Sequence, residues 1–421
     1  MHPARFDANL KGCPCCFIVP PHMLQRLATS GDPALAETAG RTLRLTQSLV
    51  AFRAQLSTGA PSPAALKRQG LRRQVFNCQA TNDLPGEPVR SETDTTPNRD
   101  KAVNEAFDNA GTTWDFYNKI FGRESVDNHG KTLVSSVHYG ENYDNAFWNG
   151  QQMVYGDGDG VIFQRFTTAL DVIAHELTHG VTQFTAQLAY QDQPGALNES
   201  MSDVFGSMVK QWALGQTAAQ ADWLIGAAIM APGFKGRALR DMANPGTAYD
   251  DPRLGKDPQP GHMRDYVQTD ADNGGVHTNS GIPSRAFVLA AKAIGGNAWE
   301  RVGKIWYVTL TARLTGNADF AKCAAETVSV ARDLFPEDSS IAAKVAKAWA
   351  DVGVLEEAPS TALLANIAGA YVIAPRMREV AIAPSLPKTK KKKPLPPSRA
   401  AGKAARGALK KKAKSSRSKT R

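Results

Sequence analysis

A glutamate between two histidines marks the middle of the chain, in the run His175-Glu176-Leu177-Thr178-His179. Side chains at positions i and i+4 of a helix point from one face, so both imidazoles can reach a single metal ion. Glu176 lies one step further round the helix, where it can contact a water on that metal without being a ligand. The pattern predicts a zinc site with a general base beside it. An ordinary surface helix with two histidines fits the same five residues, so the neighbouring sequence decides.

An acidic segment twenty residues beyond His179 completes the metal-binding set, in the run Asn198-Glu199-Ser200-Met201-Ser202-Asp203. Glu199 and Asp203 are again four residues apart and share a helical face. Glu199 is the predicted third ligand, which leaves the open fourth position of a catalytic zinc. Asn198 and Asp203 are suited to orient the imidazoles through their other ring nitrogens. A helix N-terminus also favours acidic residues, but that does not explain their pairing with two histidines.

The elements that must position these side chains follow from the spacing of apolar residues. From 71 to about 169 the chain holds turns and short alternating runs, such as 134–137 and 153–155. These predict a β-rich region with one early helix near Lys101–Phe121. From 169 to about 354 apolar residues recur at helical spacing. The predicted helices are 169–188, 197–214, 282–294, 298–313, 318–334 and 338–352.

The sequence therefore predicts an α+β protein in four segments. Residues 1–70 form a short leader, with a helical pattern between 35 and 56. Residues 71–184 form a β-rich N-terminal domain that ends in the zinc helix, and 185–355 form a helical C-terminal domain. Residues 356–421 form a disordered basic tail, because a sequence rich in alanine, proline and lysine cannot bury a core.

The net charge of +10 belongs to the tail alone. Residues 388–421 contain fifteen lysines or arginines and no acid, so the rest of the chain carries −5. The basic composition therefore does not indicate nucleic-acid binding by the folded part. The tail can attract polyanions such as nucleic acid or anionic lipid, but a solvated extension is the simpler interpretation.

Other compositional features exclude some classes of protein. No apolar stretch approaches the roughly 18 to 20 residues of a membrane span. The N-terminus has only a short apolar run broken by prolines, which is not the form of a secretory signal. Five cysteines, at positions 13, 15, 16, 78 and 323, form no regular framework, so mostly free thiols are predicted.

An ordered series of motifs resembles the thermolysin family over about residues 71–354. The motifs, beside the two metal-binding runs above, are Asn145-Ala146-Phe147-Trp148, Met153-Val154-Tyr155-Gly156-Asp157-Gly158-Asp159-Gly160 and Asp272-Asn273-Gly274-Gly275-Val276-His277-Thr278-Asn279-Ser280-Gly281. The resemblance implies a zinc endopeptidase of protein substrates, active as a monomer. It also implies a β-rich and a helical domain with the zinc site in the cleft between them.

The resemblance assigns further residues to catalysis. His277 would stabilise the developing oxyanion or donate a proton, with Asp272 holding its ring. Tyr190 would donate a hydrogen bond to the same oxyanion. Arg240 would bind a carbonyl of the substrate backbone.

The family also implies how an extended substrate is held. Asn145 and the Ala146 carbonyl would bind its backbone. An apolar pocket would select a bulky apolar residue after the cleaved bond. The residues that would line the pocket are Phe163, Phe166, Val172, Ile229 and Leu239.

Two departures from the family concern calcium and the leader. Thermolysin-like enzymes often bind calcium behind the zinc helices, and Asp171 and Asp222 match that site. Lys210 stands where an acid is expected, as do Leu224 and Ala227, and an ammonium disfavours Ca²⁺. We therefore expect Lys210 to replace the calcium charge by pairing with Asp171 or Asp222.

The leader is shorter than that of thermolysin and resembles protealysin-like precursors. Phe17-Ile18-Val19-Pro20-Pro21-His22-Met23-Leu24 matches their Pro-Pro-aromatic-x-Leu segment, with His22 replacing the aromatic residue. This implies an inhibitory leader that the enzyme removes itself, between about residues 50 and 76. Cys13, Cys15 and Cys16 beside it could supply a thiolate to the open zinc position, form a separate metal or redox site, or be incidental thiols.

Two alternatives differ from a secreted endopeptidase. A zinc aminopeptidase would need a segment that captures the substrate's amino terminus, and the sequence shows none. A catalytically idle scaffold that binds polyanions would not need Glu176, Tyr190 and His277 together. The family's usual secretion conflicts with the N-terminus, so cytoplasmic synthesis or non-standard export is the alternative location.

Overall fold

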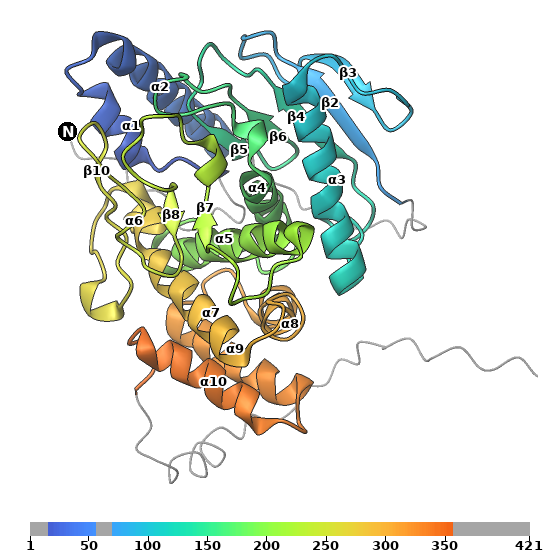
Figure 1. Ribbon diagram of the computed structural model, residues 1–421, viewed down its shortest axis with the longest axis vertical. Helices are drawn as coiled ribbons and strands as arrows, with labels where there is room; N and C mark the ends of the chain where they lie inside the picture. Colours follow the sequence, from blue (N-terminus) through green and yellow to red (C-terminus); the bar gives the residue numbers. More distant parts are fainter. Residues whose placement is uncertain (1–15, 56–69, 357–421) are drawn as a thin grey trace, which may run out of the picture. The chain divides into compact units, whose positions relative to one another are not determined.

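The structure is a computed structural model that describes residues 16–55 and 70–356 of the 421-residue chain. The tail from residue 357 onward lies outside the described residues, as do Cys13, Cys15 and residues 56–69, which form the middle of the predicted self-cleavage range of about 50 to 76. The fold class is as predicted, with a β-rich N-terminal half and a helical C-terminal half (Figure 1).

Six strands form one mixed sheet in the order β1-β5-β6-β4-β2-β3. Pairing is parallel between β2 and β4 and between β4 and β6, and antiparallel elsewhere in this sheet. Two of the strands match the alternating runs predicted from the sequence, β4 and β6. The bounds are β1 (Cys16–Phe17), β2 (Arg73–Asn77), β3 (Glu87–Ser91), β4 (Leu133–Val137), β5 (Ala146–Trp148) and β6 (Met153–Tyr155).

Helix α3 (Lys101–Phe121) packs on this sheet and has the predicted bounds. Its start is fixed because the Asp100 side chain accepts a hydrogen bond from the Ala102 amide. It ends at Gly122, whose φ of 67° places it in the left-handed region that glycine adopts readily.

The C-terminal half consists mainly of packed helices, and its two central members are α4 and α5 (Figure 1). The predicted helix 298–313 is divided, since α8 passes into a π-helical turn at Thr309–Arg313. The bounds are α4 (Leu170–Gln183), α5 (Asp192–Leu214), α6 (Asp272–Asn279), α7 (Gly281–Ile294), α8 (Val302–Val308), α9 (Phe320–Leu334) and α10 (Ser339–Asp351).

Helix α5 begins five residues before its predicted start at 197. Short strands and turns connect the helices of this half. The two-stranded ribbons are β7 (Leu224–Ile225) with β8 (Arg240–Asp241), and β9 (Asp250–Asp251) with β10 (Gly255–Lys256). Single 3-10 turns lie at Phe166–Thr168, Ala227–Ile229 and Met263–Asp265.

The leader folds against the rest of the protein through β1, α1 (Pro21–Ala28) and α2 (Pro33–Gln55). Its buried side chains join the main apolar core with exposed fractions of 5% or less, which fixes the leader in place. These side chains are Ile18, Val19, Met23, Leu24, Leu27, Leu35 and Ala39.

Candidate metal centre and active site

Helices α4 and α5 bring the three predicted metal ligands together. The ligand atoms of His175, His179 and Glu199 all lie within 4.8 Å of one another. The two Nε2 atoms are 3.0 Å apart, and they lie 3.4 and 3.5 Å from the Glu199 carboxylate. All three side chains are buried. Within residues 16–55 and 70–356 this is the one group of three or more His, Cys, Asp or Glu side chains arranged to hold a metal.

The hydrogen bonds around this group leave its lone pairs facing inward. His175 Nδ1 donates to Asp203 Oδ1 at 2.7 Å, and His179 Nδ1 donates to Asn198 Oδ1 at 2.9 Å. When both imidazoles are neutral, these bonds leave the two Nε2 lone pairs available to a metal ion. Glu199 Oε2 is buried and accepts no hydrogen bond. A cation resolves this clustering of acceptors, and two imidazoles with one carboxylate fit a catalytic zinc.

Electrostatics also favour a charged carboxylate at the centre. Burial alone would raise the pKa of Glu199, but the neighbouring His277, His179 and His175 outweigh it and hold the pKa well below its usual value. Glu199 therefore remains an anion and can serve as a ligand.

Glu176 is poised as a proton acceptor beside the three ligands. Its Oε2 accepts a hydrogen bond from the Trp148 amide at 2.9 Å, whereas its Oε1 is buried without a hydrogen-bond partner. Burial raises the pKa of Glu176 well above its usual value. A carboxylate with one restrained and one free oxygen, and with a raised pKa, suits a general base.

His277 lies opposite, on α6, with both ring nitrogens engaged. Its Nδ1 donates to Asp272 Oδ1 at 2.7 Å, and its Nε2 donates to the Phe17 carbonyl at 2.7 Å. Burial lowers the pKa of His277, but Asp272 and Glu199 outweigh that effect and raise it to about 9. The Tyr190 hydroxyl lies 3.4 Å from His277 Nε2 and donates to Glu199. The two groups are therefore neighbours, although here His277 donates to the Phe17 carbonyl and Tyr190 to Glu199.

The backbone of α6 explains how His277 reaches this position. Asn273, Gly274 and Gly275 have φ values of 52°, 83° and 74°, so the helix contains a kink. A Cβ on Gly274 would lie 2.1 Å from Asp192 Oδ1, hence only glycine fits there. This helix is not among those predicted from the sequence.

Arg240 and Asn145 hold the leader where the resemblance places a substrate. Arg240 Nη1 donates to the Ile18 carbonyl at 3.0 Å. The Val19 amide donates to Asn145 Oδ1 at 2.9 Å, and the Ile18 amide donates to the Ala146 carbonyl at 3.1 Å.

The carboxylate of Asp203 links the metal-binding group to Arg240. Asp203 accepts from His175 and from Arg240, whose Nε and Nη2 donate at 2.7 and 2.8 Å. The predicted role of Asp203 toward the histidines did not include these contacts with Arg240. Gln259, whose Nε2 donates to the His277 carbonyl at 2.7 Å, was not predicted either. A glutamine outside every motif gives no sequence signal.

The five predicted pocket residues are all buried and belong to the same apolar core as Ile18 of the leader. Each has an exposed fraction of 1% or less. They come from three regions of the chain, which the fold brings into one cluster. These residues are Phe163, Phe166, Val172, Ile229 and Leu239.

Behind the zinc helices, an ammonium group lies where calcium is expected. Lys210 Nζ lies 3.1 Å from Asp171 Oδ2, 3.0 Å from Asp222 Oδ1 and 2.7 Å from the Leu224 carbonyl. Burial lowers the pKa of Lys210, but the two carboxylates outweigh it and raise it. A charged lysine with three oxygen partners does not fit a calcium ion at this position.

The expectation of free thiols is correct for Cys78 and Cys323 but wrong for Cys16, which is disulfide-bonded. A disulfide sulfur is not a thiolate, so Cys16 cannot supply the predicted zinc-blocking ligand in this state. Its side chain packs with Tyr190 and Val276 instead.

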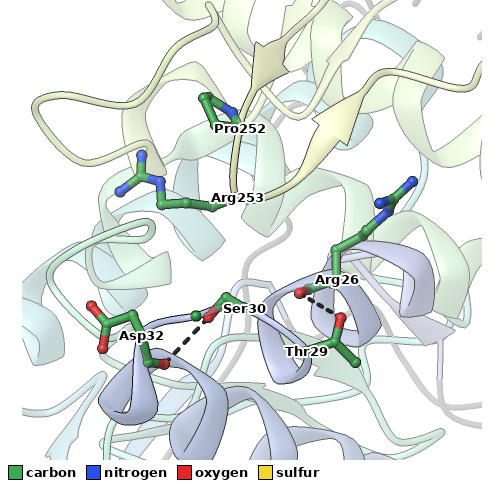
Figure 2. A pocket seen from close by; sticks show the side chains of 7 residues that line it. Arg26, Thr29, Ser30, Asp32, Pro252 and Arg253 are labelled. Carbon is green, nitrogen blue, oxygen red and sulfur yellow. Dashed lines mark hydrogen bonds between the residues drawn. The ribbon is translucent and has the colours of Figure 1, made fainter.

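An open pocket of about 330 Å³ lies where the α1–α2 turn of the leader meets the β9–β10 turn (Figure 2). Its lining contains none of the predicted catalytic residues. The residues labelled in the figure are Arg26, Thr29, Ser30, Asp32, Pro252 and Arg253.

Among the described helices, none is both long and apolar enough to cross a membrane.

Comparisons with known proteins match most of the chain. The family model described as thermolysin metallopeptidase, catalytic domain, matches residues 60–183, and that of the alpha-helical domain matches 186–354. An extracellular metalloprotease of Pectobacterium carotovorum subsp. carotovorum is 51% identical over 347 residues, which cover 82% of this chain and 98% of that protein. The protease PrtS of Photorhabdus sp. (strain Az29) is 44% identical over 351 residues, covering 82% and 92%.

A solved structure is also similar, namely the precursor of protealysin, a metalloproteinase from Serratia proteamaculans. The TM-score is 0.74 at 51% sequence identity, and the match covers 81% of this chain and 100% of that chain.

Proposed function

The chain belongs to the thermolysin family of zinc-dependent metallopeptidases, and from this premise we propose that it is a self-cleaving zymogen of an endopeptidase that cuts before bulky apolar residues. The observation that carries the proposal is the leader segment Phe17–Val19, bound by the same residues that the resemblance assigns to the substrate.

Each catalytic component has its own residues. His175, His179 and Glu199 would hold zinc, which when bound supplies a Lewis acid that polarises the scissile carbonyl. Glu176 Oε1 takes the proton of the attacking water and delivers it to the leaving amine. The protonated His277 and the Tyr190 hydroxyl stabilise the negative charge that develops on the carbonyl oxygen.

The remaining residues orient the peptide. Arg240 binds the carbonyl that follows the cleaved bond, and Asn145 with the Ala146 carbonyl holds the backbone in an extended conformation. Asp203 fixes Arg240 through two hydrogen bonds. Because these bonds fix the guanidinium, little side-chain entropy is lost when Arg240 binds a substrate carbonyl.

In this proposal the leader, residues 1–70, is an inhibitor that occupies the substrate-binding residues. The tail beyond residue 356 binds polyanions or is a solvated extension. Secretion is proposed because a similar protein is named extracellular metalloprotease.

Internally quenched peptides that differ only in the residue after the cleaved bond test the proposal. We expect kcat/KM for Leu, Ile or Phe at that position to exceed that for Ser or Asp by about 10²-fold, since the pocket is apolar. Acetylated peptides should be cut as fast as free ones. Cleavage that requires a free amino terminus would instead indicate an aminopeptidase, and absence of any cleavage an idle scaffold.

Leader docking is predicted to weaken in acid through His22. Its Nε2 accepts from the Tyr249 hydroxyl at 3.0 Å. Burial is the main reason that the pKa of His22 is lowered from 6.5 to about 4. The negative charge of Asp272 raises this pKa, whereas the positive charges of His277, Arg240 and Arg26 lower it further. The docked leader therefore requires neutral His22, so the free energy of docking is unaffected above about pH 6.5 and becomes less favourable as the pH falls toward 4.

The measurement is the rate of linker cleavage, which releases the leader, in the native chain divided by that in His22→Phe, in which nothing titrates at this position. Since catalysis at each pH cancels in the ratio, we expect a constant value above pH 6.5 and an increase of up to roughly tenfold per pH unit below it. A flat ratio between pH 7.5 and 5 would contradict a buried neutral His22.

Calcium is not expected to stabilise the enzyme. Removing Ca²⁺ with a chelator in the presence of zinc should leave the melting temperature of Glu176→Ala, a background that prevents autolysis, unchanged. Adding Lys210→Ala should lower the stability by about 3 kcal/mol, because Asp171 is left buried without its cation. Added Ca²⁺ should restore part of that loss. Two calcium ions found in the purified native chain would refute the hypothesis that Lys210 takes the place of calcium.

A further inference from the structure

The leader does more than cover the active site, because its hydrogen bonds specify one register. Cys16 and Phe17 pair antiparallel with Trp148 and Phe147 of β5. Beyond the strand the same alignment continues through the Ile18 amide on the Ala146 carbonyl and the Val19 amide on Asn145. Asn145 Nδ2 also donates to the Val19 carbonyl at 3.3 Å. The segment is thus held at each residue from 16 to 19.

This register places one particular peptide bond at the catalytic residues. The Phe17 carbonyl accepts from His277 Nε2 at 2.7 Å, whereas the next carbonyl, that of Ile18, accepts from Arg240 at 3.0 Å. His277 is the proposed oxyanion donor and Arg240 binds the carbonyl after the cleaved bond. The bond between these two carbonyls is Phe17–Ile18.

The side chains fit the same register. Ile18 is fully buried in the core that contains the apolar pocket residues, as expected for the residue after the cleaved bond. Phe17 is 5% exposed and packs on Phe147, with ring centroids 5.2 Å apart. Glu176 Oε1 accepts no hydrogen bond from the leader, so its lone pairs are not engaged by it.

We infer that Phe17–Ile18 is a self-cleavage site, separate from cleavage in the linker that follows α2. The inference rests on the proposed function. Water adds to the Phe17 carbonyl carbon, the bond to the Ile18 nitrogen breaks, and Glu176 transfers the water proton to that nitrogen. The products are a carboxylate at Phe17 and an α-amine at Ile18, with no other reactant consumed.

Cleavage at this bond does not release the leader. The N-terminal product remains paired with β5, and the C-terminal product remains anchored by Met23, Leu24 and Leu27, which are fully buried. Because both new ends stay in place, they can rejoin, and the nicked leader continues to block substrate. Release requires the cut in the linker.

The test follows the zinc-loaded full chain by mass spectrometry of samples that are quenched in acid and then reduced. We expect a species that begins at Ile18, present at a substantial fraction before or together with linker cleavage. It should be absent from Glu176→Ala. Leader fragments that keep an intact Phe17–Ile18 bond through complete activation would overturn the inference and leave the proposed self-activation standing.

Two substitutions of Ile18 distinguish loss of cleavage at the Phe17–Ile18 bond from misfolding of the leader. Ile18→Leu should retain the cut, whereas Ile18→Asp should reduce it by more than about tenfold because an apolar pocket excludes a carboxylate. Both should still be processed in the linker. Zinc content and the melting temperature, measured in the Glu176→Ala background, show whether either variant is misfolded. Equal cutting of Ile18→Leu and Ile18→Asp would overturn the inference.

If no self-processing occurs anywhere, the proposed self-activation fails, and the bond is tested in trans. The enzyme is then freed of its leader by an added protease and mixed with a synthetic peptide of residues 16–28. Cutting between Phe17 and Ile18 supports the register, and cutting elsewhere or not at all overturns it. Binding of the same peptide to leader-free Glu176→Ala gives a readout independent of activity, and the Ile18→Asp peptide should bind at least tenfold more weakly.

Discussion

Replacing Glu176 with glutamine is expected to lower kcat on casein or a quenched peptide by about 10²- to 10⁴-fold, when both enzymes have been freed of the leader by an added protease. The glutamine carbonyl can still accept from the Trp148 amide, which holds Oε2 at 2.9 Å in the native chain. The geometry is therefore kept while the proton acceptor is lost. The same variant should remain full length during incubation, because self-processing uses the same base.

Zinc content and melting temperature show whether Glu176→Gln is folded and loaded. Glu105→Gln is the matched control, since it makes the same chemical change in α3, where Glu105 pairs with Arg165. Its kcat should stay within about twofold of the native value. If Glu176→Gln processes itself at the native rate, another group supplies the base.

Removal of a metal ligand has an equally large expected effect. Glu199→Ala leaves His175 and His179 without the anion that completes their site, and we expect zinc affinity to fall by more than the 10- to 100-fold that is typical for loss of an outer hydrogen-bond partner. Activity at stoichiometric zinc should then be undetectable. Metal analysis and competition with a chelator measure the affinity directly.

Asp203→Asn supplies the comparison for this experiment, because Asp203 holds His175 without being a ligand. Its zinc affinity should fall by only about 10- to 100-fold. In the native chain a chelator should abolish activity, zinc should restore it and Ca²⁺ should not. Full activity of zinc-free protein would refute the assignment of the metal centre.

The elements that carry the metal ligands were predictable because helical periodicity is a local property. His175 and His179 share a face for any helix through residues 170–183, and Glu199 and Asp203 follow the same rule on α5. The bounds of α3 were predictable for the same reason, since Asp100 and Gly122 mark its two ends.

The remaining features depend on contacts that no local pattern encodes. The kink in α6 follows from the close approach of Asp192 to Gly274, and these residues are far apart in the sequence. The register of the leader is fixed by Asn145, Arg240 and His277, which lie 126 to 260 residues from the atoms they bind. The sequence shows that these residues are polar, but no local pattern shows that they bind the leader on either side of the Phe17–Ile18 bond.

The shared carboxylate of Asp203 constrains how this enzyme can evolve. Because Asp203 supports both His175 and Arg240, a substitution of Asp203 is expected to weaken metal binding and peptide binding together. Divergence in specificity is therefore expected to proceed through the predicted apolar pocket residues. An engineer who seeks a new cleavage preference should mutate Leu239 or Ile229 and leave Asp203 unchanged.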